Sequence, residues 1–226
     1  MVFPLLAFLS PIVTAVGASV ASIGPAVAGF CANVLPTLAI YIEKGLEVMK
    51  MIAQVANTLA TVMDILRPNE TVEDMGDRAL QAAEQGIVPE QFDSHADYVD
   101  ALRNFELDPD KNKDKPLEKI VAGLAVVSGG LDDKLGLAEG TAGQLFTLVG
   151  ANPDYFSADR LTQYLKSGQD IAAVVDYFAG KLGGAESLDV EDGLVDLEKN
   201  RAPEQDDTSI RARLYQAQSA IQATEP

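Results

Sequence analysis

The sequence has 226 residues, a formal net charge of −17 at pH 7, and hydrophobic residues at 47% of its positions. This apolar content is sufficient for a folded core and excludes a globally disordered chain. The negative charge opposes binding to phosphate backbones, so we expect no nucleic-acid partner. The chain holds one cysteine, Cys31, which excludes an internal disulfide framework.

The negative charge is distributed unevenly along the chain. Positive and negative residues cancel within 1–67, so the whole net charge belongs to residues 68–226. Such a change in composition indicates a domain boundary. We therefore divide the chain into an apolar or amphipathic helical segment at 1–67, an acidic helical domain at 68–200, and a linker with a C-terminal amphipathic helix at 201–226.

The first 42 residues carry no charged side chain, and Gly24-Pro25 divides them into two apolar segments. A single helix of this length would measure about 63 Å, which is twice the hydrocarbon thickness of about 30 Å in a bilayer. Two antiparallel segments would match that thickness, so we expect a helical hairpin over 2–42. A conventional secretory signal is a poor fit, because no Lys or Arg precedes Lys44.

Small residues and a proline recur at every fourth position of this run. Small side chains at that spacing allow helices to approach closely. Prolines interrupt the run and would kink its helices, which favours a segment that exchanges between protein and lipid over a stable anchor. We expect a helix-packing or membrane-facing stripe formed by Gly17, Ala21, Pro25 and Gly29.

Apolar residues at steps of three and four predict one long amphipathic helix over 37–66, ended by Arg67-Pro68. From Met51 onward most of its circumference is apolar. Such a helix must be buried by partner helices, sister subunits or lipid. We expect an assembly face formed by Leu38, Ile42, Leu46 and Met49.

The acidic remainder of the chain reads as a series of short helices. Thr71 and Ser94 each precede an acidic residue at capping-box spacing, so both predict helix starts. An apolar helix over 117–127 is expected to end at Ser128-Gly-Gly130, and a later one over 141–149 at Gly150. Further helices are expected over 159–166, 171–181 and 209–223.

Alternating strand patterns are nearly absent from the sequence. The expected fold is therefore all-α: an apolar N-terminal helical hairpin and a long amphipathic helix, followed by an acidic body of short helices. The pattern G-x-x-P-x-x-F occurs at 86–92 and again at 150–156. It indicates either a structural repeat or two helix corners that are alike by chance, and both interpretations stay open.

No constellation of residues predicts catalysis or ligand binding. Residues 108–114 begin like a calcium-binding EF-hand loop, but lysines occupy the positions of its Gly and its bidentate Glu. A solvated charged linker is therefore expected there. His95 is the only histidine, so we expect no His-based zinc site and place it on the surface of a first helical turn.

Two further patterns also lack the partners that chemistry requires. The glycine pairs near 128–130 and 140–143 are not followed by the Lys-Ser/Thr of a phosphate-binding loop. Three adjacent carboxylate pairs lie in Gly- or Pro-containing surroundings without signs of a cleft: Asp132-Asp133, Glu191-Asp192 and Asp206-Asp207. We expect no catalytic, cofactor-binding or metal-binding residues, and no enzyme.

The uncharged front and acidic remainder together favour a non-enzymatic helical protein. The first hypothesis is a component or cargo of a phage particle or a secretion or injection machine, whose front end inserts as a hairpin into a target membrane. This plan resembles phage ejection proteins and effectors of contractile injection systems, by analogy alone.

Burial against protein demands the same apolar surface as burial in lipid, so a second hypothesis stays open. In it the chain is a structural subunit whose residues 1–67 are buried in a homo-oligomer or a large assembly. A resident membrane protein is a weaker third hypothesis, since few positive residues flank the apolar segments.

Overall fold

A computed structural model describes residues 10–223 of the chain. The described residues form twelve α-helices and two short 3₁₀ helices, and they contain no strand, so the all-α prediction is confirmed. The chain divides into two compact units, one ending at Gly150 and the other beginning at Ala151.

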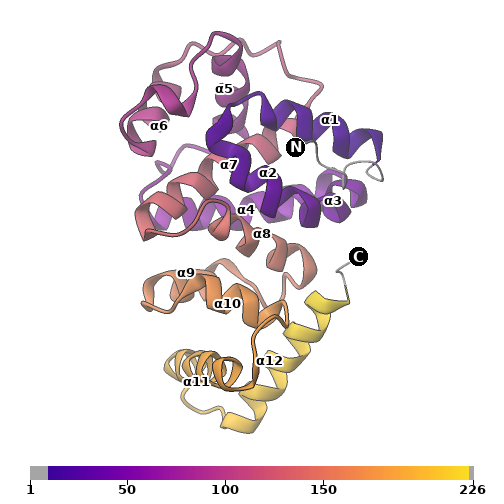
Figure 1. Ribbon diagram of the computed structural model, residues 1–226, viewed down its shortest axis with the longest axis vertical. Helices are drawn as coiled ribbons and strands as arrows, with labels where there is room; N and C mark the ends of the chain where they lie inside the picture. The colour runs from indigo at the N-terminus through magenta and orange to yellow at the C-terminus, as the bar shows by residue number, and fades with distance from the viewer. Residues whose placement is uncertain (1–9, 224–226) are drawn as a thin grey trace. The chain divides into compact units, whose positions relative to one another are not determined.

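Figure 1 labels the α-helices of both units. The first unit holds α1 (Pro11–Ala21), η2 (Pro25–Val27), α2 (Ala28–Asn33), α3 (Leu35–Lys44), α4 (Leu46–Val62), α5 (Val72–Glu84), η3 (Pro89–Gln91), α6 (His95–Asn104), α7 (Pro116–Leu135) and α8 (Thr141–Ala151). The second unit holds α9 (Ala158–Lys166), α10 (Ile171–Phe178), α11 (Gly184–Arg201) and α12 (Asp207–Gln222).

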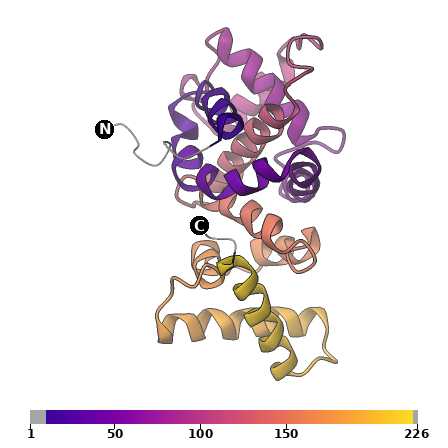
Figure 2. The ribbon, with the colours of Figure 1, turned by 90° about the vertical axis from the view of Figure 1, so that its right-hand side faces the viewer.

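Helix α7 is the centre of the first unit. Every residue from Ile120 to Ser128 is buried, so this stretch is covered on all sides. A helix that is apolar all round has to be covered in this way. Helices α1, α2, α4, α5 and α6 all contact it. Figure 2 shows α7 between the indigo helices α1 and α2 on one side and the magenta α5 on the other.

Helices α5 and α7 cross with their backbones close together, and two glycines make this crossing possible. A Cβ atom on Gly123 of α7 would lie 1.8 Å from the carbonyl oxygen of Val72 on α5. A Cβ on Gly76 of α5 would lie 1.9 Å from the carbonyl oxygen of Lys119 on α7. Because both neighbours are backbone atoms, no side-chain rotation could relieve either clash.

Helix α7 is longer than the sequence predicts. The glycines at 128–130 do not end it; the helix continues to Leu135 and ends with Gly136 in the left-handed conformation, at φ 65°. Gly129 and Gly130 instead leave space for the ring of His95, which a Cβ atom on either glycine would approach closely. The glycines that read as a helix stop therefore serve packing between helices.

The single long helix predicted over 37–66 is wrong. The chain breaks at Gly45, whose φ of 102° is a backbone conformation that favours glycine, so α3 and α4 are separate helices. Leu38, Ile42 and Met49 are fully buried within the unit, and Leu46 is half-buried. The side chains expected to form an assembly face are therefore largely covered by the same chain.

The helix starts predicted at Thr71 and Ser94 are confirmed. The Thr71 hydroxyl accepts a hydrogen bond from the Asp74 amide at 3.0 Å and begins α5. The Ser94 hydroxyl accepts one from the Asp97 amide at 3.1 Å and begins α6. Each cap satisfies a backbone amide that the helix itself leaves without a partner.

The two G-x-x-P-x-x-F segments have only part of their structure in common. Both lead into a serine cap, Ser94 before α6 and Ser157 before α9. Gly86 follows α5 with φ 77°, whereas Gly150 lies inside α8, where a Cβ would be 2.9 Å from the ring of Tyr41. The glycine of the second segment is thus a packing residue, and α8 does not end at it.

A buried ion pair and several hydrogen bonds hold the helices of the second unit together. The Arg160 guanidinium on α9 pairs with the carboxylate of Glu198 on α11, with Nη2 and Oε2 3.0 Å apart, and both residues are buried. It also stacks on the Tyr155 ring, 4.0 Å from the ring centre. On the same face of α11, Glu191 accepts hydrogen bonds from the hydroxyls of Tyr177 and Tyr215.

The two structural units differ from the division at residues 67 and 200 that charge suggests. Residues on both sides of 67 belong to the first unit, because Arg103 of α6 donates to the Ile65 carbonyl and to the Glu70 carboxylate. Residues on both sides of 200 belong to the second, since Lys199 of α11 pairs with Asp207 of α12. Contacts between helices thus cross the points at which composition changes.

Gly123→Ala is expected to lower the free energy of unfolding by about 3 kcal/mol, because its methyl group would overlap the Val72 carbonyl. Urea unfolding followed by circular dichroism measures this change. Gly184→Ala at the start of α11 is the matched control, since a Cβ there meets nothing within 4 Å. Equal stability of the two variants would show that the α5–α7 crossing is not tight.

Arg160→Met is expected to cost about 3–5 kcal/mol, because it leaves the Glu198 carboxylate buried without its partner. The double variant Arg160→Met, Glu198→Leu is expected to recover most of this loss, since it removes both charges. A double-mutant cycle in urea measures the coupling. If the losses of the two single variants simply add in the double variant, Arg160 and Glu198 do not form a coupled buried ion pair.

Candidate functional site

The feature that stands out chemically is an uncharged N-terminal layer, defined here as residues 10–42. It has no charged side chain and comprises α1, η2, α2 and most of α3. Its large apolar residues point into the unit: Val16 on α1, Phe30 on α2 and Leu38 on α3 are all buried. Helices α1 and α2 contact α7, so the layer covers one side of the central helix.

The outward face of α1 is also uncharged, and apart from Ile12 its side chains are small. Ala15, Ala18 and Ala21 are exposed, and Ile12 is 44% exposed. Buried valines at Val13, Val16 and Val20 occupy the opposite face. The two faces of α1 therefore differ mainly in the size of their side chains, and neither face carries a charge.

The small-residue stripe expected from sequence does not form one continuous surface. Gly17 packs against Leu35, and Gly29 packs against the backbone of Glu139, whereas Ala21 and Pro25 are exposed. A spacing of four keeps residues on one face only within one continuous helix. The chain turns at Gly24, where φ is 131°, and the second arm of the expected hairpin is broken into η2, α2 and α3.

Two acidic residues of the body make polar contacts with the layer. The carboxylate of Glu90, which lies in η3, accepts a hydrogen bond from the Ala26 amide in η2. The Glu139 carbonyl accepts one from the Asn33 side chain at 3.3 Å. These contacts hold the turn before α2 and the last residue of α2, so Glu90 and Glu139 act as clamps on the layer.

Membrane-spanning capacity within residues 10–223 is limited to one bent pair of helices. None of the helices described there is by itself long and apolar enough to cross a bilayer. The segments Pro25–Asn33 and Leu35–Lys44 meet the length and composition criteria together, with a bend of 69° between them.

From the sequence we expect His95 on the surface of a helical turn. In the structure its side chain is mostly buried instead. Its ring lies across Gly129 and Gly130 of α7 and is hydrogen-bonded to the backbone of Val126. Its Nε2 atom is buried without a hydrogen-bond partner. Burial lowers the pKa of the ring, and this effect outweighs the Val126 hydrogen bond and the charge of Asp133, which both raise it.

The acidic loop at 108–114 is anchored by its own polar residues. The Asn112 side chain donates to the Asp77 carboxylate at 2.8 Å, and the Asp108 backbone exchanges two hydrogen bonds with Gln81. Within residues 10–223, no group of three or more His, Cys, Asp or Glu side chains is arranged to hold a metal ion. Polar residues of the alternating pattern thus attach the loop to α5.

The adjacent carboxylate pairs supply helix caps and ion pairs. Asp132 accepts hydrogen bonds from the amides of Gly140 and Ala142, both at 2.7 Å, just before and within α8. Asp206 caps α12 through the Ser209 amide. Glu191 is held by the tyrosine hydroxyls described above, and both Glu191 and Asp192 pair with Arg211 of α12, so at least one member of each pair has a structural role.

A cavity of about 130 Å³ lies beside α5 and α6, and Arg103 and Glu70 at its wall form an ion pair. The Arg103 guanidinium binds both oxygens of Glu70, at 2.7 and 2.9 Å. Burial acts to raise the pKa of Glu70, yet the hydrogen bonds and charge of Arg103 lower it overall. This pairing joins α6 to the turn before α5 and leaves these two groups little capacity for a ligand.

Comparison of the chain with protein-family models, with curated proteins and with solved structures found no match. The candidate site therefore depends on the geometry of residues 10–42 and their contacts. Sequence reasoning identified the uncharged run itself. It missed Glu90, Glu139 and His95, because nothing local in the sequence links these residues to α2 or to α7.

The regular spacing of small residues predicts the same effect on helix packing for a leucine at position 21 or 29, whereas the structure predicts different effects. Gly29→Leu is expected to destabilise the fold by about 1–3 kcal/mol, because even its Cβ would lie 2.4 Å from that of Glu139. Ala21→Leu is expected to have little effect, since Ala21 is exposed. Urea unfolding of both variants checks this. Equal losses would mean that Ala21 is covered.

Proposed function

We propose that this chain is a non-enzymatic helical component or cargo of a phage particle or of a secretion or injection machine. Its N-terminal layer is stored against α7 and transferred into a target membrane after release. The observation that carries the proposal is that residues 10–42 are uncharged throughout and form a peripheral layer on the central helix.

Transfer of the layer exchanges one apolar environment for another. The valine, leucine and phenylalanine side chains that α7 covers would be covered by acyl chains instead. A single charged residue at the centre of a bilayer costs about 2.5–3.5 kcal/mol on insertion scales, and this layer has none. The clamps at Glu90 and Glu139 belong to the body and would stay outside.

The dimensions of the bent helix pair are compatible with this step. Residues 25–44, which extend past the layer to the charged Glu43 and Lys44 at their end, would measure about 30 Å as one straight helix, close to the thickness of a bilayer core of about 30 Å. The bend of 69° between α2 and α3 would have to open first. Insertion therefore requires the layer to leave α7, and the acidic body favours a neutral lipid surface over an anionic one.

The exposed face of α1 favours a second candidate, a structural subunit of an assembly. Its small uncharged residues, with Ile12 at 44% exposure, would allow another helix to approach closely. In that case the layer stays on α7 and the outward face contacts another copy or another protein. Both candidates agree that the chain carries no chemistry of its own.

A cross-link across one clamp tests whether the layer must be released. We would replace Asn33 and Glu139 by cysteine in a Cys31→Ser background, because the Asn33 side chain reaches the Glu139 carbonyl at 3.3 Å. A short bismaleimide then joins α2 to the loop before α8. The unlinked chain is expected to float with neutral liposomes and release an entrapped dye, and the linked chain is expected to do neither.

Single-cysteine variants treated with the same reagent are the controls for modification alone. Leakage by the linked and unlinked chains alike would show that the layer does not need to leave α7. A chain that never floats and forms a defined oligomer, measured by light scattering, would overturn the membrane proposal in favour of the structural subunit.

A further inference from the structure

We propose that His95 is an acid-sensitive latch that holds the segment 89–95 on α7, and that protonation of its ring frees the N-terminal layer. The latch itself can be tested in solution without a membrane. It would supply the trigger for release of the N-terminal layer, and the later insertion of that layer into a membrane rests on the proposed function.

The geometry of the ring carries the inference. His95 is the first residue of α6, and its imidazole fits a slot on α7 that exists because Gly129 and Gly130 have no side chains. A Cβ on Gly129 would lie 2.9 Å from the ring carbon Cε1. Neutral imidazole tolerates a buried Nε2 without a partner, because that atom need not carry a proton. The imidazolium would bury an unsatisfied N–H and a charge.

The groups packed against the ring give the charged form little compensation. Asp133 of α7 favours protonation, but burial outweighs it and keeps the pKa low. Tyr98 of α6 meets the ring edge-on at 6.0 Å and stays neutral, because burial raises the pKa of its hydroxyl. Ile65, which follows α4 and also contacts Gly130, is apolar. The exposed Asp97 carboxylate accepts from Ser94 instead.

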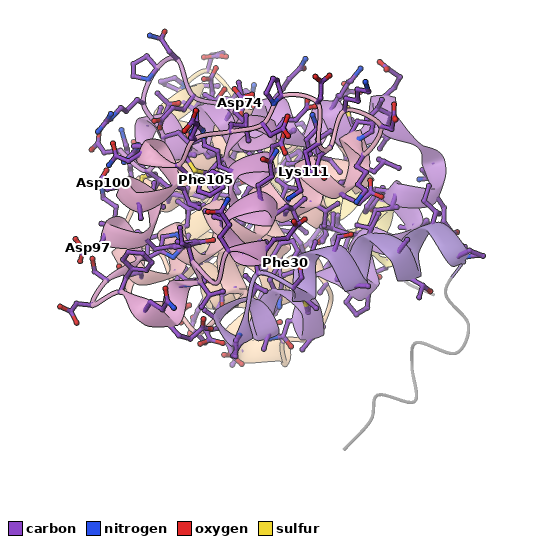
Figure 3. All side chains as sticks on the ribbon, turned by 90° about the horizontal axis from the view of Figure 1, so that it is seen from above. Phe30, Asp74, Asp97, Asp100, Phe105 and Lys111 are labelled. Atoms are coloured by element: carbon purple, nitrogen blue, oxygen red, sulfur yellow. The ribbon has the colours of Figure 1, made fainter. Side chains whose placement is uncertain are left out.

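The latch and the Glu90 clamp belong to the same short segment. Glu90 precedes His95 by only five residues. Phe92 lies between them in sequence, and the centre of its ring is 5.7 Å from that of Tyr98, three residues after His95. Figure 3 shows Asp97 and Asp100 of α6 together, apart from Phe30 of α2. Because Glu90 and His95 are so close in the chain, displacement of the segment from α7 would withdraw Glu90 from the Ala26 amide.

The direction of the pH effect follows from the lowered pKa. The opened state binds a proton on His95 more readily than the closed state, so acid favours opening. The closed state keeps its full advantage above the unperturbed histidine pKa of about 6.5. Below it, the opening equilibrium increases by up to about tenfold for each pH unit, until the pKa of the buried ring is reached.

Cys31 provides a natural reporter, because it is the only cysteine and its half-buried thiol lies on α2. The full chain would be treated with 4,4′-dithiodipyridine, which reacts with thiols at acidic pH. Rates would be divided by the rate of the urea-unfolded chain at the same pH. This normalised rate is expected to rise by up to about tenfold between pH 7 and pH 5.5.

His95→Phe keeps an aromatic ring but cannot titrate, so its normalised rate is expected to be the same at both pH values. His95→Gln replaces it if the phenylalanine variant does not fold. In the matched control Glu90→Gln, the rate is expected to increase at both pH values and to keep its dependence on pH. A full acid-induced rise in the His95 variants would overturn the latch.

Vesicle leakage separates the latch from the proposed function. Cys31 exposure at pH 5.5 without leakage from neutral vesicles would uphold the latch and contradict membrane insertion. Equal leakage at pH 7 and pH 5.5, by the wild-type chain and by His95→Phe, would uphold insertion and overturn the latch.

Discussion

The close crossing of α5 and α7 at Gly76 and Gly123 is the constraint on which the first unit depends. At this crossing the backbones are in contact, so the position of α7 is fixed by atoms that cannot rotate away. Helices α1, α2, α4 and α6 also pack on α7. The N-terminal layer contacts it through α1 and α2, so the place of the layer on the fold depends on the position of α7.

Glycine is used for a second purpose along the same helix. Gly129 and Gly130 admit the ring of His95, which gives α6 a specific register on α7 at the expense of a buried ring nitrogen without a partner. The second unit is stabilised differently, by the buried pair of Arg160 and Glu198. Close backbone approach fixes the α5–α7 crossing of the first unit, whereas a fully buried charge pair joins α9 to α11 in the second.

These two strategies suit different requirements. A layer held by apolar packing and a few polar clamps can leave its partner helix without exposing a buried charge, because it contains none. A unit held by a buried ion pair cannot open so readily, since separation would leave charges without partners in the interior. The proposed division of labour, a releasable front and a firmly held second unit, is consistent with this contrast.

The sequence by itself determined the all-α class, the helix starts at Thr71 and Ser94, and the uncharged run, because these depend on local pattern and composition. Only the tertiary structure decided that Gly45 breaks a helix while Gly129 and Gly130 lie within one. It also decided that Glu90 and His95 act on distant helices. The physical reason is that glycine permits both a turn and a close contact, and the neighbour that selects between them is distant in sequence.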